Sequence, residues 1–472
     1  MVGFFVYDLS FLVLFCAFVA WFLYSRKKGL QREGIMFLYK TKFGMTFIDH
    51  VGTKYKKVLH ALKYPIILVG YGLMGMIIYM LGLVVYTYIA LPEIVDVVKA
   101  PPVMPLIPYF PQIFGVESFF PPFYFIYFLI AIIIVAFSHE FAHGIYMRLY
   151  KIKIKSTGIA FLGPILGAFV EQDDKDMQSK PATQQMTVLG AGVFANLILA
   201  LIFFLLMVGF FSVSFAPAGY VFSSYAVSEI PIGSISGFGE RLENTEIILN
   251  TQLKKVNLTQ IEVGERSYFM VSELVPQVSN LSDKYAYVFD DAPAINVRLQ
   301  GIVREIDGVK ITGQKSLAEY LEGKSPGDQI VIKTLVDGEE MNYELILDEH
   351  PLHKGGAYLG VGSAGPVSGG FKKVLSIFVN FKNPSTYYEP SWNGEIVNFI
   401  YNLLWWVAII NFFVALFNML PVGILDGGRF FYLTVRGITK SEKVGQKAFK
   451  VMTWLILLLF ISMILSWIWA LV

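Results

Sequence analysis

The sequence contains few of the residues that normally cover a soluble protein. Only 16% of its 472 residues are charged and 55% are hydrophobic, whereas a soluble domain carries about 25% charged residues. The formal net charge of +2 is too small to indicate a nucleic-acid partner. A single cysteine, Cys16, excludes an intrachain disulfide. The composition therefore predicts a membrane protein.

Six stretches approach the roughly 20 apolar residues that a helix needs to cross a bilayer. They lie near residues 4–24, 66–91, 122–147, 187–213, 396–420 and 451–472. The first stretch lacks the basic leader and the cleavage site of a signal peptide, so we expect a retained span. Its one carboxylate, Asp8, is expected to be solvated near the outer interface.

Basic residues are distributed unevenly between the loops. Ten lysines and arginines lie between residues 25 and 65, whereas Lys99 is the only one between 93 and 120. Because cytoplasmic loops carry the excess of these residues, the amino terminus is expected outside the cell membrane. The alternation continues after the third and fifth spans, which predicts that both termini are extracytoplasmic.

The sequence HEFAH, residues 139–143, falls in the last turns of the third span. Histidines four residues apart share one face of a helix, so both can bind one ion while Glu140 lies beside them. Catalytic zinc takes three protein ligands and a water whose pKa falls to about 7. A glutamate can move that water's proton to a leaving amine. A structural role for the histidines is the alternative, but ionisable residues within a span are usually functional.

The third ligand must come from elsewhere in the chain. The other four histidines are all expected in loops: His50, His60, His350 and His353. The carboxylate that stands out is Asp426 in NMLPVGILDGGRF, residues 418–430, where proline and glycines interrupt the end of the fifth span. Spans three and five run in the same direction, so the two half-sites should meet on one side. A simple Asp-Gly turn that ends the helix is the alternative.

Together the two motifs resemble the active site of the site-2 protease family of intramembrane zinc metalloproteases. That family pairs an HExxH helix with an Asn-x-x-Pro-x-x-x-x-Asp-Gly segment, and residues 418–427 match this spacing. The resemblance implies that His139, His143 and Asp426 bind Zn²⁺. It also implies that Glu140 is the catalytic base.

Three further features match the same family. Residues 157–171 resemble its re-entrant β-hairpin, which could hold an extended substrate by β-addition. Gly192 and Asn196 fit a GxxxN pattern that predicts either substrate contact or close helix packing. Asn418 is expected to anchor the substrate backbone, or else to satisfy carbonyls freed by the nearby proline.

Between the fourth and fifth spans the composition becomes mixed polar and strand-like. Within residues 301–347, QIVIKTLV alternates as a half-buried strand does, and Asp307-Gly308 and Asp337-Gly338 are hairpin signals. With a helix expected at 315–323, this region resembles a protease-associated PDZ domain. A long insertion within 219–290 leaves its carboxylate-binding loop unassigned.

Two other predictions concern the same region. Asn257 and Asn280 begin glycosylation sequons, which suit an exported domain. Residues 370–382 predict an amphipathic helix, either at the outer interface, where it would help to control substrate access, or as a linker.

The predicted fold is a polytopic α-helical membrane protein with about six transmembrane helices, a re-entrant β-hairpin and an extramembrane α+β PDZ-like domain. Residues 1–92 form two helices and a basic cytoplasmic loop, and 93–213 form the first part of the catalytic core. Residues 214–368 form the PDZ-like domain, and 369–472 complete the core. The first two spans add no chemistry that the sequence reveals.

The family resemblance implies cleavage of single-span membrane proteins within the lipid bilayer, after another protease has removed their outer part. We hypothesise that the outer domain excludes intact ectodomains by size. A cation or proton transporter would need more carboxylates across the spans, and a PDZ-containing scaffold would not need Glu140. A prenyl-protein type of HExxH peptidase would use a downstream glutamate instead of Asp426. The sequence leaves the oligomeric state open.

Overall fold

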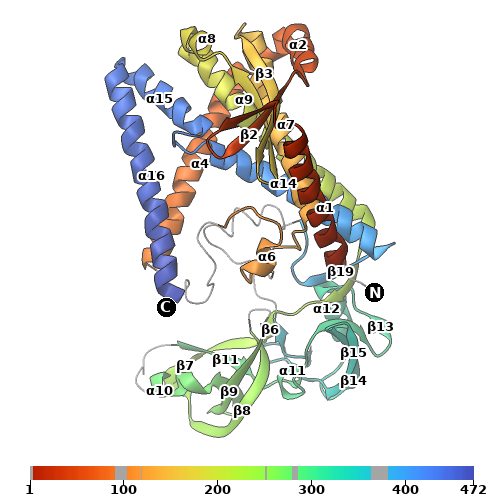
Figure 1. Cartoon of the computed structure of the whole chain (residues 1–472). Coiled ribbons are helices and arrows are strands. Elements are labelled where there is room, and N and C mark those ends of the chain that lie inside the picture. The colour runs from red at the N-terminus through yellow and green to blue at the C-terminus, as the bar shows by residue number, and fades with distance from the viewer. Residues whose placement is uncertain are drawn as a thin grey trace. The chain divides into compact units, whose positions relative to one another are not determined.

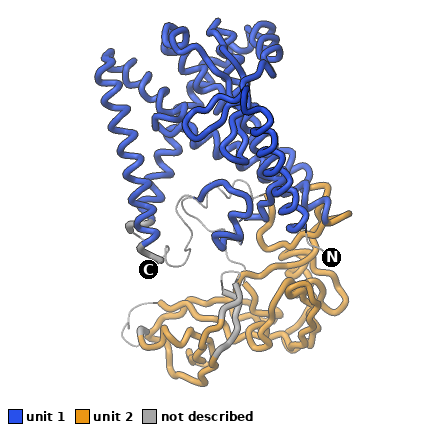
Figure 2. The backbone as a smooth tube through the Cα atoms, viewed as in Figure 1, with its two compact units in different colours: residues 1–211, 395–472 blue, residues 212–394 orange. Residues whose placement is uncertain are grey.

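The computed structural model describes residues 4–90, 104–117, 120–249, 252–278, 285–362 and 381–471. The chain forms two compact units, coloured separately in Figure 2. Unit 1 comprises residues 1–211 and 395–472, and unit 2 comprises residues 212–394. Unit 2 is therefore an insertion within the sequence of unit 1.

Six helices of the described residues are long and apolar enough to cross a membrane (Figure 1). They are α1 (Phe4–Ser25), α4 (Lys63–Ala90), α7 (Phe125–Leu149), α9 (Ala182–Ser214), α14 (Gly394–Asn418) and α16 (Glu442–Leu471). The predicted number of spans is confirmed. The last helix begins at Glu442 instead of residue 451, because its lysine-containing first turns also favour helix.

A four-stranded antiparallel sheet packs against α7 in unit 1. Its strands, in spatial order, are β1 (Leu30–Glu33), β2 (Met36–Thr41), β3 (Ile154–Leu162) and β4 (Ile165–Gln172). The hairpin predicted at 157–171 is thus present as β3 and β4. The segment expected as a basic loop instead supplies β1, β2, α2 (Met45–Lys54) and α3 (Lys56–Ala61), so His50 and His60 lie on helices.

One carboxylate joins three strands of this sheet. The Oε2 atom of Glu171 on β4 accepts hydrogen bonds from Lys40 Nζ on β2 and Ser156 Oγ on β3, each at 2.6 Å. The lysine and the hydroxyl hold the pKa of Glu171 below its usual range. Glu171 thereby links β2, in the segment that follows the first span, to the hairpin of β3 and β4. This link helps to hold β4 beside α7.

The amino terminus of α7 is capped by a side chain from another helix. Backbone N–H groups in a helix's first turn lack partners within the helix, and α7 has no capping side chain of its own. Asp8 of α1 accepts from the amides of Phe125 and Ile126 at 2.7 and 3.0 Å and from the Tyr109 hydroxyl at 2.6 Å. Asp8 is only 4% exposed. The expectation that it is solvated is wrong, because its oxygens satisfy α7.

We expect Asp8→Ala to lower the stability of unit 1. The change leaves two helix amides and a hydroxyl without their charged acceptor, which should cost about 3 kcal/mol. Thermal unfolding in detergent measures the loss. Ser10→Ala on the same helix is the matched control, because the Ser10 hydroxyl is exposed and bonds only to its own helix. Equal melting midpoints for both variants would refute the capping role.

Unit 1 also contains three shorter helices: α6 (Phe110–Ile113), α8 (Asp174–Ser179) and α15 (Asp426–Thr439). Helix α15 follows the end of α14 after a tight turn and packs against α16. The segment around α6 is anchored by aromatic contacts, since Phe110, Phe120 and Phe123 surround Trp406 of α14. Helices α7 and α14, which carry the two sequence motifs, are thus linked through this segment.

Unit 2 is built on a six-stranded antiparallel sheet. It contains β15 (Glu339–Ile346), β14 (Gln329–Val336), β12 (Ile302–Ile306), β5 (Phe215–Tyr220) and β19 (Thr386–Pro390) in this order, with β13 (Val309–Lys310) beside β12. Both predicted hairpin turns are present, with Asp307 and Asp337 at positive φ. The predicted helix is α12 (Gln314–Glu322). The PDZ resemblance itself stays a prediction.

The region expected as an insertion forms a second sheet with its own small core. Its strands, in spatial order, are β7 (Val227–Pro231), β11 (Tyr285–Asp290), β10 (Arg266–Val271), β9 (Gln252–Val263) and β8 (Gly237–Leu249). The core contains Ile230, Ile261, Met270 and Val288. Asn257 lies on β9, whereas Asn280 and most of the helix predicted at 370–382 lie outside the described residues.

Short elements complete unit 2. Two paired strands are β6 (Ser224–Tyr225) with β18 (Val361–Gly362), and β16 (Asp348–Glu349) with β17 (Ala357–Tyr358). Its remaining helices are α10 (Val275–Val278) and α11 (Pro293–Asn296), with 3-10 turns at Ile232–Ser234 and Ser272–Leu274.

Candidate metal centre

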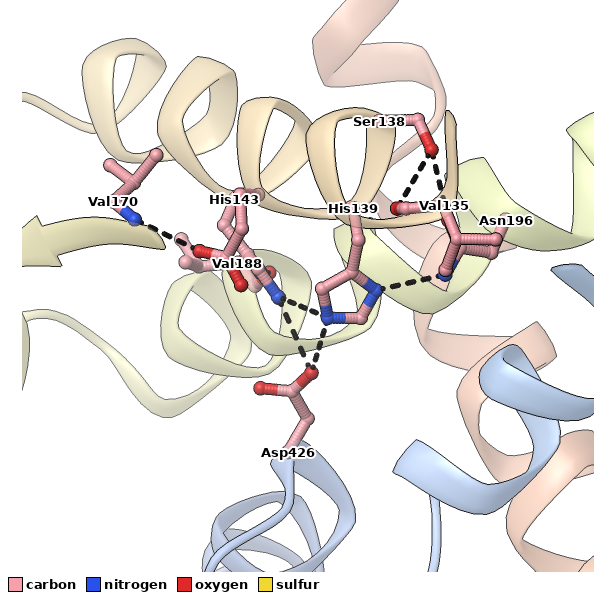
Figure 3. Close-up of polar contacts among 9 residues, drawn as sticks. Val135, Ser138, His139, His143, Val170, Val188, Asn196 and Asp426 are labelled. Carbon is pink, nitrogen blue, oxygen red and sulfur yellow. Dashed lines mark hydrogen bonds and ion pairs between the residues drawn. The ribbon is translucent and has the colours of Figure 1, made fainter. Parts of the chain in front are cut away.

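Helix α7 presents two imidazoles on one face. His139 and His143 are 8% and 7% exposed, and their Nε2 atoms lie 3.0 Å apart. Figure 3 shows both rings projecting from α7 toward the carboxylate of Asp426. The four-residue spacing thus brings two nitrogen ligands to one point, as the sequence predicts.

Asp426 reaches the same point from α15. Its Oδ2 lies 3.1 Å from His139 Nε2 and 3.3 Å from His143 Nε2. The prediction that the two half-sites meet is confirmed. As the first residue of α15, the carboxylate also lies where a helix favours negative charge.

The glycines beside Asp426 permit the tight turn that delivers it. A Cβ at Gly427 would lie 2.4 Å from the Met419 carbonyl oxygen, and one at Gly428 would lie 2.2 Å from that of Val422. Neither contact can be relieved by a side-chain movement, because both involve backbone. The Asp-Gly-Gly sequence is therefore required for α15 to begin so close to the end of α14.

Glu140 has a different environment from Asp426. Its Oε2 accepts a hydrogen bond from the Val170 amide of β4 at 3.0 Å. One ligand atom of each of His139, Glu140 and His143 lies within 4.8 Å of the others, and Asp426 Oδ2 lies 3.1 and 3.3 Å from the two Nε2 atoms. Asp426 therefore fits a direct metal ligand, and Glu140 fits a base beside the metal.

The outer nitrogens of both imidazoles are held by α9. His143 Nδ1 donates to the Val188 carbonyl at 2.7 Å, so its Nε2 lone pair is free for a metal. The Asn196 amide lies 3.2 Å from His139 Nδ1 and 3.1 Å from Ser138 Oγ. In the structure the amide nitrogen faces His139 and the amide oxygen accepts from Ser138. Turned over by 180°, an assignment that the hydrogen-bond network decides, the amide would accept the Nδ1 proton and donate to Ser138. Nε2 of His139 is then also free, as zinc requires.

The other predicted site residues lie at different distances from this centre. Gly192 lies directly beneath the imidazoles, since a Cβ there would be 2.5 Å from His143 Nε2 and 2.7 Å from His139 Nε2. Asn196 is fully buried, and its contacts are those of a residue that orients His139. Asn418 ends α14, half-buried, and its side chain makes no hydrogen bond to the described part of the chain.

Several residues that shape the centre were not predicted. The amide of Val170 and the carbonyl of Val188 act through the backbone, so no side-chain pattern identifies them. Arg429 of α15 donates to Gln185 of α9 at 3.1 Å, which links the element carrying Asp426 to the helix behind the histidines. Gln185 lies in the polar stretch just before the predicted fourth span, where one more polar residue carries no distinguishing signal.

The donor set fits a zinc ion. Two imidazole nitrogens and one carboxylate oxygen, 3.0 to 3.3 Å apart, converge from two helices, and such a set leaves a fourth position open. Within the described residues, the His139, Glu140 and His143 trio on α7 is also grouped closely enough to hold a metal, and it shares both imidazoles with this donor set.

A polytopic helical protein with this centre falls in the class of membrane zinc metallopeptidases. The chain belongs to peptidase family M50, whose family model matches residues 127–461. It is 24% identical, over 67% of its length and 84% of the relative's, to a Clostridium perfringens protein provisionally named a zinc metalloprotease. An uncharacterized Methanocaldococcus jannaschii protein is 25% identical over 89% of this chain and 84% of its own length. The resemblance to site-2 proteases is thereby confirmed.

Proposed function

We propose that this protein is an intramembrane zinc endopeptidase that hydrolyses peptide bonds in the transmembrane segments of single-span membrane proteins. The observation that carries the proposal is the approach of Asp426 to both histidines, which joins the two motifs into one centre. Unit 2 and both termini are extracytoplasmic in this proposal. Cleavage follows removal of the substrate's outer part by another protease, as in regulated intramembrane proteolysis.

Each residue of the centre has a distinct task. His139, His143 and Asp426 would hold the metal. Asn196, with its amide turned over so that the oxygen faces His139 Nδ1, would keep His139 in the tautomer that leaves Nε2 free. Zinc, when bound, supplies Lewis acidity that activates water and polarises the scissile carbonyl. Glu140 would take the proton from the attacking water and deliver it to the leaving nitrogen. The Val170 amide keeps its carboxylate oriented between these two events.

Strand β4 offers a place for an extended substrate. It is the edge strand of its sheet, and its Val170 amide points away from β3 toward Glu140. Because strand residues alternate in direction, the backbone groups of Ala168 and Leu166 face the same way as Val170. A substrate unwound from its helical form could pair with them by β-addition, beside the base. Asn418 and Gly192 remain candidate contacts for that substrate.

Purified protein in lipid nanodiscs with a single-span reporter substrate tests the proposal. We expect cleavage within the reporter's apolar segment, loss of cleavage after zinc is chelated, and recovery when zinc is restored. Mass spectrometry of the fragments locates the cut. A second reporter that keeps a folded outer domain is expected to remain uncut, because unit 2 excludes it by size.

Two outcomes would contradict the proposal. Cleavage confined to residues outside the apolar segment would indicate a peptidase that cuts extramembrane loops and not transmembrane segments. Cleavage that continues without zinc would show that the reaction does not need the metal. Deletion of residues 219–350 is the control for the size filter, since intact substrates should then be cut.

A further inference from the structure

The last helix of unit 1 has two opposite faces. Gly445, Ile456 and Met463 of α16 are buried, and at about 100° per residue they fall within about 20° of one another around the axis. This face packs against α15 and α4. A Cβ at Gly445 would already lie 3.2 Å from Tyr432 of α15, so the packing there is close.

A shallow, open groove of about 980 Å³ lies along the other face of α16, and every residue that lines it belongs to this helix. Its lining residues are Lys443, Gln446, Lys447, Lys450, Val451, Trp454, Leu455, Leu458, Leu459 and Ser462. The three lysines lie about 140 to 200° from Gly445 and so form one stripe on the face that does not pack. The groove is basic in its first turns and apolar beyond them.

The positive charges of the lysines in this groove are not paired with carboxylates of the described residues. No aspartate or glutamate lines the groove, and no carboxylate of the described residues forms an ion pair with Lys443, Lys447 or Lys450. Three unpaired cations on one face attract an anionic group. They also disfavour a partner helix that would bring similar basic residues to the same depth.

The length of the apolar part matches one leaflet of a bilayer. From Val451 to Ser462 the helix rises about 17 Å, and half of a typical hydrocarbon core is about 15 Å. Trp454, 66% exposed, lies next to the lysines, where the amphipathic indole ring is favoured at the interface. The lysines are then at the level of the lipid headgroups.

We propose that this groove binds an anionic phospholipid, with its phosphate at Lys443, Lys447 and Lys450 and an acyl chain along Val451 to Ser462. Basic pockets at the ends of transmembrane helices recognise lipid headgroups in this way. Every helix end in a membrane meets lipid, so the proposal concerns preference: an anionic headgroup is retained here over a zwitterionic one.

Helix α16, which carries the proposed lipid site, also packs against the turn that leads to the metal centre. Phe449 lies on the packed side of α16, and its ring approaches the turn that delivers Asp426, at 3.4 Å from a Cβ at Gly423 and 3.0 Å from one at Gly428. A lipid that steadies α16 would therefore steady this turn. This consequence for activity rests on the proposed function, whereas lipid binding does not.

Native mass spectrometry of the full chain tests the proposal. Protein is released from nanodiscs made of equal parts phosphatidylglycerol and phosphatidylcholine, and the retained lipids are counted. The triple variant Lys443→Gln, Lys447→Gln, Lys450→Gln is compared with the control Lys54→Gln, Lys56→Gln, Lys57→Gln, which removes three exposed lysines near the start of α4. We expect the groove variant to lose the preference for phosphatidylglycerol by at least roughly tenfold, and the control to keep it.

Three results would overturn the proposal. Equal retention of both lipids by the wild type would show that α16 holds no site for an anionic headgroup. Equal losses in the two triple variants would mean that only total charge matters. Crosslinks from a photoreactive residue at position 447 to a second copy of the chain, in place of lipid, would identify another occupant. None of these results bears on peptide hydrolysis, which the single-span reporter tests separately.

Discussion

Replacing Glu140 with glutamine is expected to reduce peptide hydrolysis at least 100-fold while zinc remains bound. Glutamine keeps an oxygen that can accept from the Val170 amide, so the geometry around it should persist. It cannot take a proton from water, and general base catalysis commonly contributes 10²- to 10⁴-fold in rate (order-of-magnitude values). Cleavage of the single-span reporter and metal content per chain are the two measurements.

The control for this variant is Glu319→Gln, which alters an exposed carboxylate of α12 in unit 2. It should match the wild type in both measurements. Full cleavage activity in the Glu140 variant would show that this carboxylate is not the base, whereas no cleavage by the wild type either would favour a scaffold or transport function. Loss of zinc together with activity would indicate instead that Glu140 is a ligand.

The second large effect is expected for Gly192→Ala. The added methyl group would lie 2.5 to 2.7 Å from atoms of both imidazoles, well inside van der Waals contact, so the rings or α9 must move. Displacing the ligands by even a fraction of this overlap should weaken zinc binding by roughly 10- to 100-fold, as loss of supporting contacts around metal ligands does. Zinc affinity by competition with a chelating dye measures it.

Gly75→Ala is the matched control, because it lies in transmembrane helix α4 and a Cβ there meets nothing within 4 Å. It should bind zinc like the wild type. The melting temperature of metal-free protein separates the effects: the Gly192 variant should resemble the wild type without metal and fail to gain its zinc-dependent stabilisation. Unchanged zinc affinity would show that the imidazoles are not the ligands.

The centre could be predicted because its decisive features are local or follow from the order of the spans. The spacing of His139 and His143 fixes a common helical face. The contact with Asp426 required a long-range argument, and the shared direction of spans three and five provided it. Both predictions depend on counting residues and spans, which a sequence permits.

Other features depend on contacts that no count reveals. The sequence around Asp8 does not reveal whether its side chain faces water or caps another helix. Asn196 lies on a small-residue face that packing alone would explain, and its partner His139 lies on a different helix. Strands β1 and β2 are short and lack clear alternation, and they form because β2 can pair with the exposed edge of β3.

We expect one zinc ion to be shared by His139, His143 and Asp426. Anomalous diffraction at the zinc absorption edge, from crystals of the purified protein, locates the ion directly. A single peak is expected within about 2.0 to 2.2 Å of both Nε2 atoms and a carboxylate oxygen of Asp426. A peak bound by other residues, or one that keeps its place and occupancy in Asp426→Ala, would contradict it.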